Sequence, residues 1–240
     1  MISRRTRVMI ALTGLLVLSM PAFAQRYSRR YAQDSDGEFR LRVGSFRPDG
    51  DSDYWRGVRN DFTNSDVSDF EGPDLGLDYL LTLNDRTSLI FSGSYYQGST
   101  TNSYRDFEDN FNNRIRHDTE LGIGSATVGV VFHLLPRGAA IQPYVGGGGG
   151  AYVWRLQERG DFIDFDAPGD PIFSARLTSN GTAFGYFGLV GLKAPITRNV
   201  SIFAEGRWTR VDDDLQDDFE GFGKLDLSGR EFAAGLSWSL

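Results

Sequence analysis

The clearest pattern in the chain is strict alternation of charged and apolar positions over residues 199–209. Glu205 and Arg207 fall on one face of an extended segment, and Ile202, Ala204 and Trp208 fall on the other. A spanning helix could not carry charges at a period of two, and a soluble sheet would turn its charges toward water. A closed transmembrane β-barrel satisfies both constraints, because lipid takes the apolar face and the interior takes the polar face.

Seven other segments carry comparable strand signals. In the first, Phe39, Leu41 and Val43 alternate with charged residues, and the last alternates up to Leu240. Eight is the smallest strand number of the known bacterial barrels. The predicted strands cover residues 38–47, 74–83, 87–96, 119–132, 141–155, 182–194, 199–209 and 230–240. The predicted fold class is therefore all-β, an eight-stranded antiparallel up-and-down transmembrane β-barrel.

The connections between these strands alternate in length. Tight turns are expected at residues 84–86, 135–138 and 195–198, and long loops at residues 47–73, 97–118, 156–181 and 210–229. Short turns on one side and long loops on the other are typical of the periplasmic and extracellular ends of outer-membrane barrels. Both ends of the barrel domain should then lie in the periplasm.

The N-terminus has the pattern of an export signal. Three arginines precede an apolar stretch over residues 8–20, which is too short for a spanning helix, and Ala22-Phe23-Ala24 supplies small residues for cleavage. A retained membrane anchor is the alternative, and Pro21 favours cleavage. The predicted organisation is a cleaved signal peptide at residues 1–24, a periplasmic arm at 25–36 and a barrel domain at 37–240.

Composition narrows the class of protein further. The chain has no cysteine, so disulfides, thiolate metal sites and cysteine nucleophiles are excluded. Its net charge is −7, and the four long loops hold 23 acidic and 10 basic residues. An exposed surface of this sign argues against nucleic acid as a partner.

Three stretches together resemble a known family. Residues 141–150 read Ile-Gln-Pro-Tyr-Val followed by five glycines, residues 204–208 read Ala-Glu-Gly-Arg-Trp, and the last strand alternates to its end. They look like the eight-stranded outer-membrane barrels of the opacity-protein and OmpA type, over residues 37–240. The resemblance implies a place in the bacterial outer membrane and recognition of the last strand by the barrel assembly machinery. These barrels usually end in an aromatic residue, whereas this chain ends in Leu240 with Trp238 two residues before it.

Charged residues at inward positions are the main candidate site. An eight-stranded barrel has an interior only wide enough for its own side chains, so these ions must pair. The arrangement is either a gate that exchanges partners to admit ions or a fixed ion-pair network in place of an apolar core, and we favour the network. The predicted members are Arg40, Arg42, Asp78, Glu120, Lys193, Glu205, Arg207 and Glu231.

The last long loop contains an acidic cluster. It could gather divalent cations weakly, or it could be a solvated surface that resists aggregation, which we favour. Its members are Asp212, Asp213, Asp214, Asp217, Asp218 and Glu220. Loop aromatic residues could contact a partner or anchor the loops at the lipid headgroups; they include Tyr54, Trp55, Phe107, Phe111, Phe162, Phe165 and Phe219.

Little in the chain favours catalysis or a cofactor. The only histidines are His117 and His133, and neither forms a His-x-Ser pairing of the kind that lipid A-trimming barrels use. The glycines at 146–150 lack the Gly-Lys-Ser/Thr of a phosphate-binding loop, so they more plausibly let a strand bend. We expect no enzyme activity, no cofactor and no metal site.

The predicted function is that of an integral outer-membrane barrel with a structural or surface-contact, adhesion-like role through four acidic extracellular loops. The alternative is a narrow, porin-like channel for ions or small solutes. The expected partners are outer-membrane lipid and lipopolysaccharide, the barrel assembly machinery, and a surface partner of unknown identity.

Overall fold

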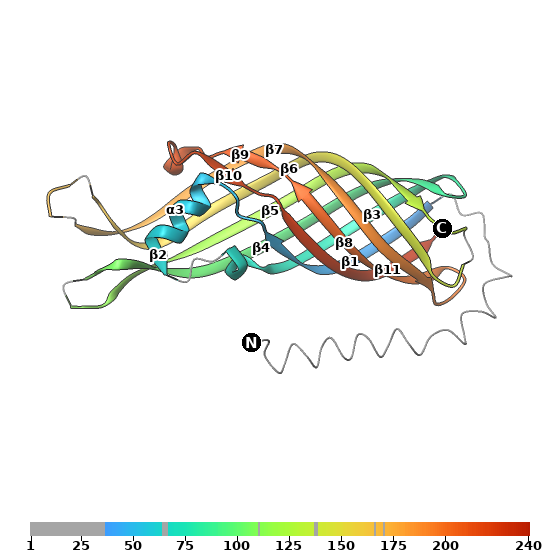
Figure 1. Ribbon diagram of the computed structural model, residues 1–240, viewed down its shortest axis with the longest axis horizontal. Helices are drawn as coiled ribbons and strands as arrows, with labels where there is room; N and C mark the ends of the chain where they lie inside the picture. Colours follow the sequence, from blue (N-terminus) through green and yellow to red (C-terminus); the bar gives the residue numbers. More distant parts are fainter. Residues whose placement is uncertain (1–36, 64–66, 110, 137–138, 166, 170) are drawn as a thin grey trace.

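Eight long antiparallel strands form a closed barrel in the computed structural model (Figure 1). The structure describes residues 37–63, 67–109, 111–136, 139–165, 167–169 and 171–240, so the predicted signal peptide and periplasmic arm lie outside the described residues. The barrel strands are β1 (Gly37–Pro48), β3 (Gly72–Asn84), β4 (Thr87–Glu108), β5 (Arg114–His133), β6 (Gln142–Ile163), β7 (Ile172–Pro195), β8 (Val200–Arg210) and β11 (Gly229–Ser239).

Each strand pairs with its neighbours along the chain, and β1 pairs with β11 to close the ring. The first residue of β1 and the last residue of the chain both lie at the end of the barrel that has the short turns, where the N–H of Leu240 donates to the carbonyl of Gly37. We call this the turn end and the opposite end the loop end. The eight-stranded up-and-down barrel predicted from the sequence is confirmed.

The prediction of four long loops is wrong for the second and third. Strand β4 continues to residue 108 and β5 already begins at residue 114. In the same way, β6 continues to residue 163 and β7 begins at residue 172. A short connection therefore joins β4 to β5, and another joins β6 to β7. Each pair forms a long hairpin that projects beyond the rim of the barrel (Figure 1). Alternation failed to reveal these extensions because both of their faces carry polar residues once the strands leave the lipid.

The first and last connections are compact structures at the loop end. The first contains α3 (Asp53–Asp61), β2 (Phe62–Thr63) and η1 (Val67–Phe70). The last contains β9 (Asp212–Asp214), η2 (Asp217–Phe219) and β10 (Lys224–Asp226). Within the described part of the chain, no helix is long and apolar enough to cross a membrane.

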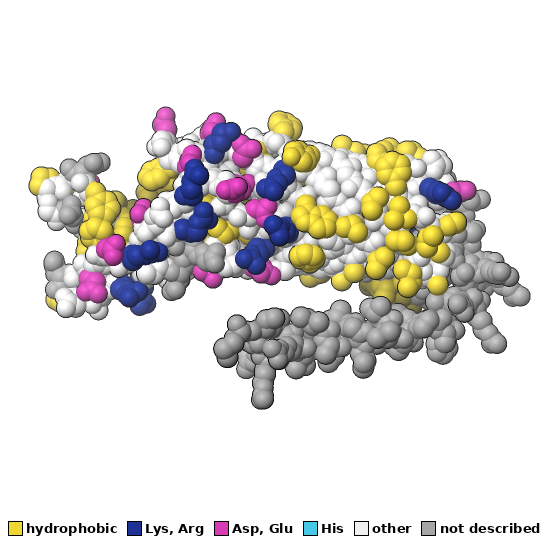
Figure 2. Space-filling model, viewed as in Figure 1, with side chains coloured by type: hydrophobic (Ala, Val, Ile, Leu, Met, Phe, Trp, Pro, Cys, Tyr) yellow, Lys and Arg dark blue, Asp and Glu magenta, His cyan; other side chains and the backbone are white. Residues whose placement is uncertain are grey.

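The outer surface divides into two zones. On the face shown in Figure 2, hydrophobic side chains gather on the half nearer the turn end, and most charged side chains lie on the half nearer the loop end. The predicted outward residues Leu41, Leu77, Phe184 and Phe232 are 47%, 57%, 83% and 67% exposed, far more than a water-soluble core would allow. This apolar belt is the lipid-facing surface of a transmembrane barrel.

Glycines on β6 permit close packing of the barrel wall. Gly148 lies opposite Gly129, and a side chain at Gly148 would overlap the carbonyl of Val128. The interpretation of the glycine run as strand is thus correct. Gly122 on β5 occupies an outward position, because its buried neighbours Leu121 and Ile123 occupy the inward positions.

Candidate functional site

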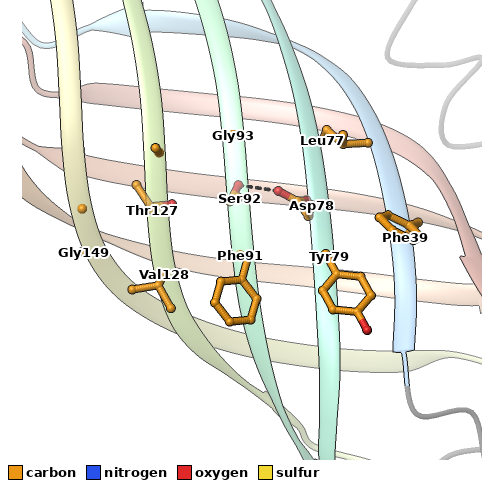
Figure 3. A pocket seen from close by; sticks show the side chains of 12 residues that line it. Phe39, Leu77, Asp78, Tyr79, Phe91, Ser92, Gly93, Thr127, Val128 and Gly149 are labelled. Atoms are coloured by element: carbon orange, nitrogen blue, oxygen red, sulfur yellow. Dashed lines mark hydrogen bonds between the residues drawn. The ribbon is translucent and has the colours of Figure 1, made fainter.

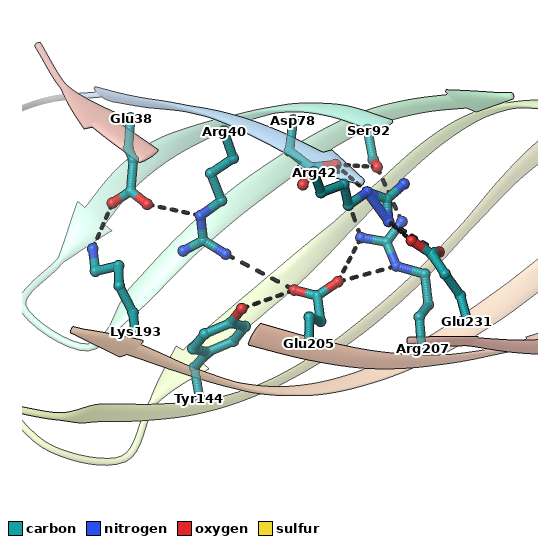
Figure 4. Close-up of polar contacts among 10 residues, drawn as sticks. All are labelled: Glu38, Arg40, Arg42, Asp78, Ser92, Tyr144, Lys193, Glu205, Arg207 and Glu231. Atoms are coloured by element: carbon teal, nitrogen blue, oxygen red, sulfur yellow. Dashed lines mark hydrogen bonds and ion pairs between the residues drawn. The ribbon is translucent and has the colours of Figure 1, made fainter. Parts of the chain in front are cut away.

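A chain of buried charges of alternating sign runs through the turn-end half of the barrel (Figure 4). It is built from β1, β3, β7, β8 and β11, which place charged residues at a period of two on their inner faces. Taken in order of contact from the turn end, the charged residues are Lys193, Glu38, Arg40, Glu205, Arg207, Asp78, Arg42 and Glu231. Four cations and four anions alternate, so the chain is electrically neutral.

The contacts nearest the turn end are short. Glu38 accepts from Lys193 Nζ at 2.6 Å and from Arg40 Nε at 2.7 Å. Arg40 is fully buried, and its Nη1 lies 3.9 Å from Glu205 Oε2. The hydroxyl of Tyr144 donates to Glu205 at 3.0 Å, and the Arg40 guanidinium lies 4.9 Å from the centre of the Tyr144 ring. A charge this deep is therefore paired and stacked rather than solvated.

The remaining contacts extend toward the middle of the barrel. Arg207 donates to Glu205 Oε1 at 3.0 Å and to the Ser92 hydroxyl at 3.0 Å, and Ser92 in turn donates to Asp78. Arg42 donates from Nη1 to both carboxylate oxygens of Glu231, at 2.9 and 3.1 Å. Removal of one partner from such a buried pair typically costs about 3–5 kcal/mol, a large part of the roughly 5–15 kcal/mol by which a folded protein is stable.

The structure brings together seven of the eight residues predicted for the interior and excludes Glu120. Glu120 is exposed on the outer face, because the inward positions of β5 are odd-numbered there, as buried Thr119 and Leu121 show. It lies above the apolar belt, where an outward charge meets water. Sequence reasoning omitted Glu38 and Asp74 from the network, although both occupy inward positions of strands whose faces were already assigned.

An apolar plug fills the loop-end half of the barrel above the ion pairs. Helix α3 inserts Tyr54, Trp55 and Val58 into the mouth, and Trp55 is fully buried. The plug also contains Phe46, Val67, Phe70, Tyr96, Leu121, Ile123, Tyr152, Trp154, Leu156, Ala183, Val211, Leu215, Phe219, Leu225 and Leu227. Its residues come from both compact connections and from the strands around them.

Polar contacts hold α3 in this position. The Ser52 side chain caps the helix by accepting from the N–H of Trp55, and Trp55 Nε1 donates to the carbonyl of Asp226 at 3.0 Å. The Tyr54 hydroxyl donates to Glu158 at 2.6 Å. Glu158 lies on β6 above the apolar belt, and burial raises the pKa of its carboxyl and raises the pKa of Tyr54 well above its usual value. The pair is thus held in a dry site.

The plug corrects one expectation about the loop aromatic residues. Tyr54, Trp55, Phe162 and Phe219 are buried, so they do not anchor loops at lipid headgroups. Phe107, Phe111, Phe165 and Phe173 are exposed on the projecting hairpins, and Phe222 is exposed on the last connection. Tyr104, Phe107 and Phe165 contact one another across the two hairpins, with ring centres 5.2–6.4 Å apart.

The space between ion pairs and plug is small. A cavity of about 30 Å³ is lined by Asp74, Glu231 and Arg207 on the side of the ion pairs and by Tyr96 and Tyr152 on the side of the plug. A volume of this size accommodates one or two water molecules but no solute.

A second concavity lies on the outside of the barrel wall (Figure 3). It measures about 470 Å³, with Gly93, Ala126 and Gly149 among the residues at its base and Phe39 and Phe91 among those at its rim. Phe39 and Phe91 belong to the apolar belt, being 41% and 46% exposed. The rim of this depression therefore belongs to the lipid-facing surface, and the inward residues Asp78, Ser92 and Thr127 also contribute to its lining.

The acidic cluster of the last connection is used mainly to fasten that connection. Asp213 accepts from Trp154 Nε1 at 2.7 Å, Asp217 from Asn180 Nδ2 at 3.2 Å and Asp218 from the N–H of Thr178 at 2.8 Å. Asp212 pairs with Lys224 at 2.7 Å. Asp214 and Glu220 are exposed. Among the described residues, no group of three or more His, Asp or Glu side chains is placed to hold a metal ion.

Both histidines lie beside aromatic rings. His133 lies near the turn end, 6.1 Å from the Tyr144 ring. His117 is almost fully buried where the two projecting hairpins separate, with the rings of Phe62, Tyr104 and Phe162 centred 4.6–6.0 Å away. Burial lowers the pKa of His117 to about 4.

Comparisons with known proteins agree with this architecture. A family model described as outer membrane protein beta-barrel domain matches residues 10–239. No curated protein sequence matches the chain.

Three solved structures resemble the fold. Neisserial surface protein A is 13% identical with a TM-score of 0.46, covering 85% of this chain and 96% of its own. OprG from Pseudomonas aeruginosa is 13% identical with a TM-score of 0.49, covering 86% and 97%. Ail, the attachment invasion locus protein of Yersinia pestis, in complex with a heparin analogue, is 18% identical with a TM-score of 0.41, covering 85% and 99%.

Proposed function

This chain belongs to the outer membrane protein β-barrel domain family, and on that premise we propose that it is a non-conducting barrel that makes contacts at the cell surface. One observation carries the proposal: the interior is filled from both ends while two hairpins project from the rim. The ion-pair chain occupies the turn-end half, and the apolar plug occupies the loop-end half. Conduction needs a continuous column of water, and the packing of side chains in both halves supports a barrel without one.

The projecting hairpins supply the surface for contact. In the bacterial outer membrane the longer connections of such barrels face outward, so the loop end is the extracellular end. Phe111 at the tip of the β4–β5 hairpin is 85% exposed, and Phe165 at the tip of the β6–β7 hairpin is 55% exposed. Apolar side chains held in water on a rigid strand pair favour a partner that covers them.

Arginines just above the apolar belt support lipopolysaccharide as a partner. Arg47, Arg210 and Arg230 lie on adjacent strands, and Arg47 is directly opposite Arg230. Asp49 pairs with Arg210 at 3.2 Å and with Arg230 at 3.4 Å, so it offsets only one of the three charges. Guanidinium groups at this height would meet the phosphates of lipopolysaccharide. The last strand, which pairs along its whole length, is the proposed signal for the assembly machinery.

The test of the conduction part is electrical. Purified protein in planar bilayers should give no steady single-channel currents, and Trp55→Ala should remain silent because the ion-pair chain below the plug still fills the barrel. Steady currents from the parent protein would replace this proposal with the narrow-channel alternative.

The test of the contact part uses bacteria that display the protein. Attachment to epithelial monolayers and cell-to-cell aggregation should fall when residues 103–115 and 161–174 are each replaced by a two-residue turn. Attachment and aggregation should also fall in a variant that carries both Phe111→Ser and Phe165→Ser. Unchanged attachment in both variants, at equal surface levels, would contradict a contact role.

A further inference from the structure

One edge of the projecting β6–β7 hairpin is an unpaired strand edge. Strand β8 pairs with β7 only from Tyr186 onward, so residues 172–185 extend past it. The last connection covers part of this edge, where Asp218 accepts from the N–H of Thr178 and Asp217 accepts from Asn180. Among the described residues nothing covers β7 between Ile172 and Arg176.

The register shows which backbone groups point away from the barrel sheet. The carbonyl of Pro171 accepts from Asp164 on the β6 side, while the N–H of Thr178 points to the other side. Backbone groups alternate in direction along a strand. The N–H and C=O of Ile172, Ser174 and Arg176 therefore point outward, with no partner among the described residues.

The opposite edge of the same projecting sheet, formed by β4, is paired with another strand of the protein. Strand β2 pairs with β4 there, through Phe62 with Tyr104 and Thr63 with Ser103. Arg105 adds side-chain hydrogen bonds to the carbonyls of Arg59 at 2.9 Å and Phe62 at 3.1 Å. The chain thus closes one edge with its own residues and leaves the other open.

The side chains along the open edge favour a particular partner. Ile172 and Phe173 are 41% and 45% exposed, the opposite of the charged side chains that usually protect an edge strand. Arg176 lies directly opposite Arg159, and both are exposed. Like charges facing each other across a strand pair are unfavourable, and neither arginine has an ion pair among the described residues.

From these observations we propose that the β7 edge at Ile172–Arg176 binds an extended segment of a partner protein, which adds a strand there and places acidic side chains beside Arg176 and Arg159. Backbone hydrogen bonds from Ile172, Ser174 and Arg176 supply affinity, and the two arginines select for acidic residues. This mode of binding rests on the proposed contact function and assigns it to one edge.

The test uses a labelled ten-residue peptide that alternates glutamate and valine, measured by fluorescence anisotropy against the full-length protein in nanodiscs. Ser174→Pro removes an outward N–H and leaves the β6–β7 ladder intact, and Ser174→Ala is its matched control. We expect the proline variant to lose at least tenfold in affinity while the alanine variant stays within twofold. Amide exchange at Ser174 and Arg176 should slow when the peptide binds.

Two further measurements keep the test decisive if the proline variant does not fold. A peptide with every second amide N-methylated should bind the parent protein at least tenfold more weakly, and Arg176→Glu should weaken the glutamate peptide and strengthen a lysine–valine peptide. Equal binding of the methylated peptide, or no binding of either peptide at millimolar concentration, would overturn strand addition. If attachment of displaying cells still depends on the hairpins in that case, the contact function stands and only this mode falls.

Discussion

The guanidinium of Arg42 on β1 lies directly against Gly76 on β3. The two residues are partners in the strand register, and a side-chain carbon at Gly76 would overlap Arg42 Nε and Cζ. Arg42 can reach Glu231 only because this position has no side chain. A glycine that weakens an isolated strand is here required by the ion-pair chain.

We therefore expect Gly76→Ala to destabilise the barrel by about 3 kcal/mol, because a displaced Arg42 leaves Glu231 buried without its partner. The outward Gly93→Ala is the matched control, since a side chain there would meet its nearest neighbour at an ordinary 3.7 Å. Urea unfolding in lipid vesicles, read by the gel shift between heated and unheated samples, measures both. Equal stabilities of the two variants would show that Arg42 has room to move.

Asp74 is a buried carboxylate beside the ion-pair chain, and the alternation of charges in that chain does not require it. Its Oδ1 has no hydrogen-bond partner, whereas Glu231 receives two hydrogen bonds from Arg42. With four cations already matched by four anions, Asp74 is a fifth acid in this part of the interior, and its side chain shares a hydrogen bond with Glu231. Asp74→Asn should be neutral or stabilising, and Glu231→Gln should cost about 3 kcal/mol. The same unfolding assay decides, and a large loss for Asp74→Asn would show that the charge count is incomplete.

Much of this barrel could be predicted from sequence because lipid imposes a simple rule. Phe39, Leu41 and Val43 can face only hydrocarbon, and that fixes Arg40 and Arg42 inside without any knowledge of their partners. The same rule stops at the edge of the membrane. Glu120 and Arg159 lie on strands whose outer face meets water, so alternation no longer marks the strand and the extensions read as loops.

The apolar plug could not be predicted from the sequence, for a different reason. Helix α3 has only three buried residues, Tyr54, Trp55 and Val58, in a nine-residue segment. A helix this short is not stable alone, so its formation depends on the cavity it enters. The cavity is built by strands far away in sequence, such as β6 with Glu158. One weak signal was present, in that Ser52 followed by Asp53 is typical of a helix start.

The Tyr54–Glu158 contact should make docking of α3 depend on pH. Burial raises the folded-state pKa of Glu158 above its ordinary 4.5, so the proton binds more tightly when α3 is docked. Stability from this group is therefore complete below pH 4.5 and is lost as pH rises through the raised pKa. Hydrogen exchange of the α3 amides, corrected for intrinsic rates, should be slower at pH 4.5 than at pH 8. Glu158→Gln should remove the difference, and an unchanged profile in that variant would assign the pH effect elsewhere.

Acid should act in the opposite direction at the base of the projecting hairpins. His117 is buried among Phe62, Tyr104 and Phe162, and its pKa is lowered from 6.5 to about 4 by burial. A base with a depressed folded-state pKa stabilises the fold above pH 6.5, and that stability is lost as pH falls toward 4. The shift corresponds to on the order of 3 kcal/mol, enough to separate β5 from β6 where their pairing ends.

Proton titration of His117 by NMR should give a pKa near 4, and the amides at 115–118 and 160–163 should exchange faster, after correction, at pH 4 than at pH 7. His117→Leu keeps an apolar group in the same aromatic surroundings and should abolish this acid response. The contact function would then weaken in acid for the parent protein and not for the variant. A His117 pKa near 6.5, or an identical acid response in His117→Leu, would rule out this residue as the cause.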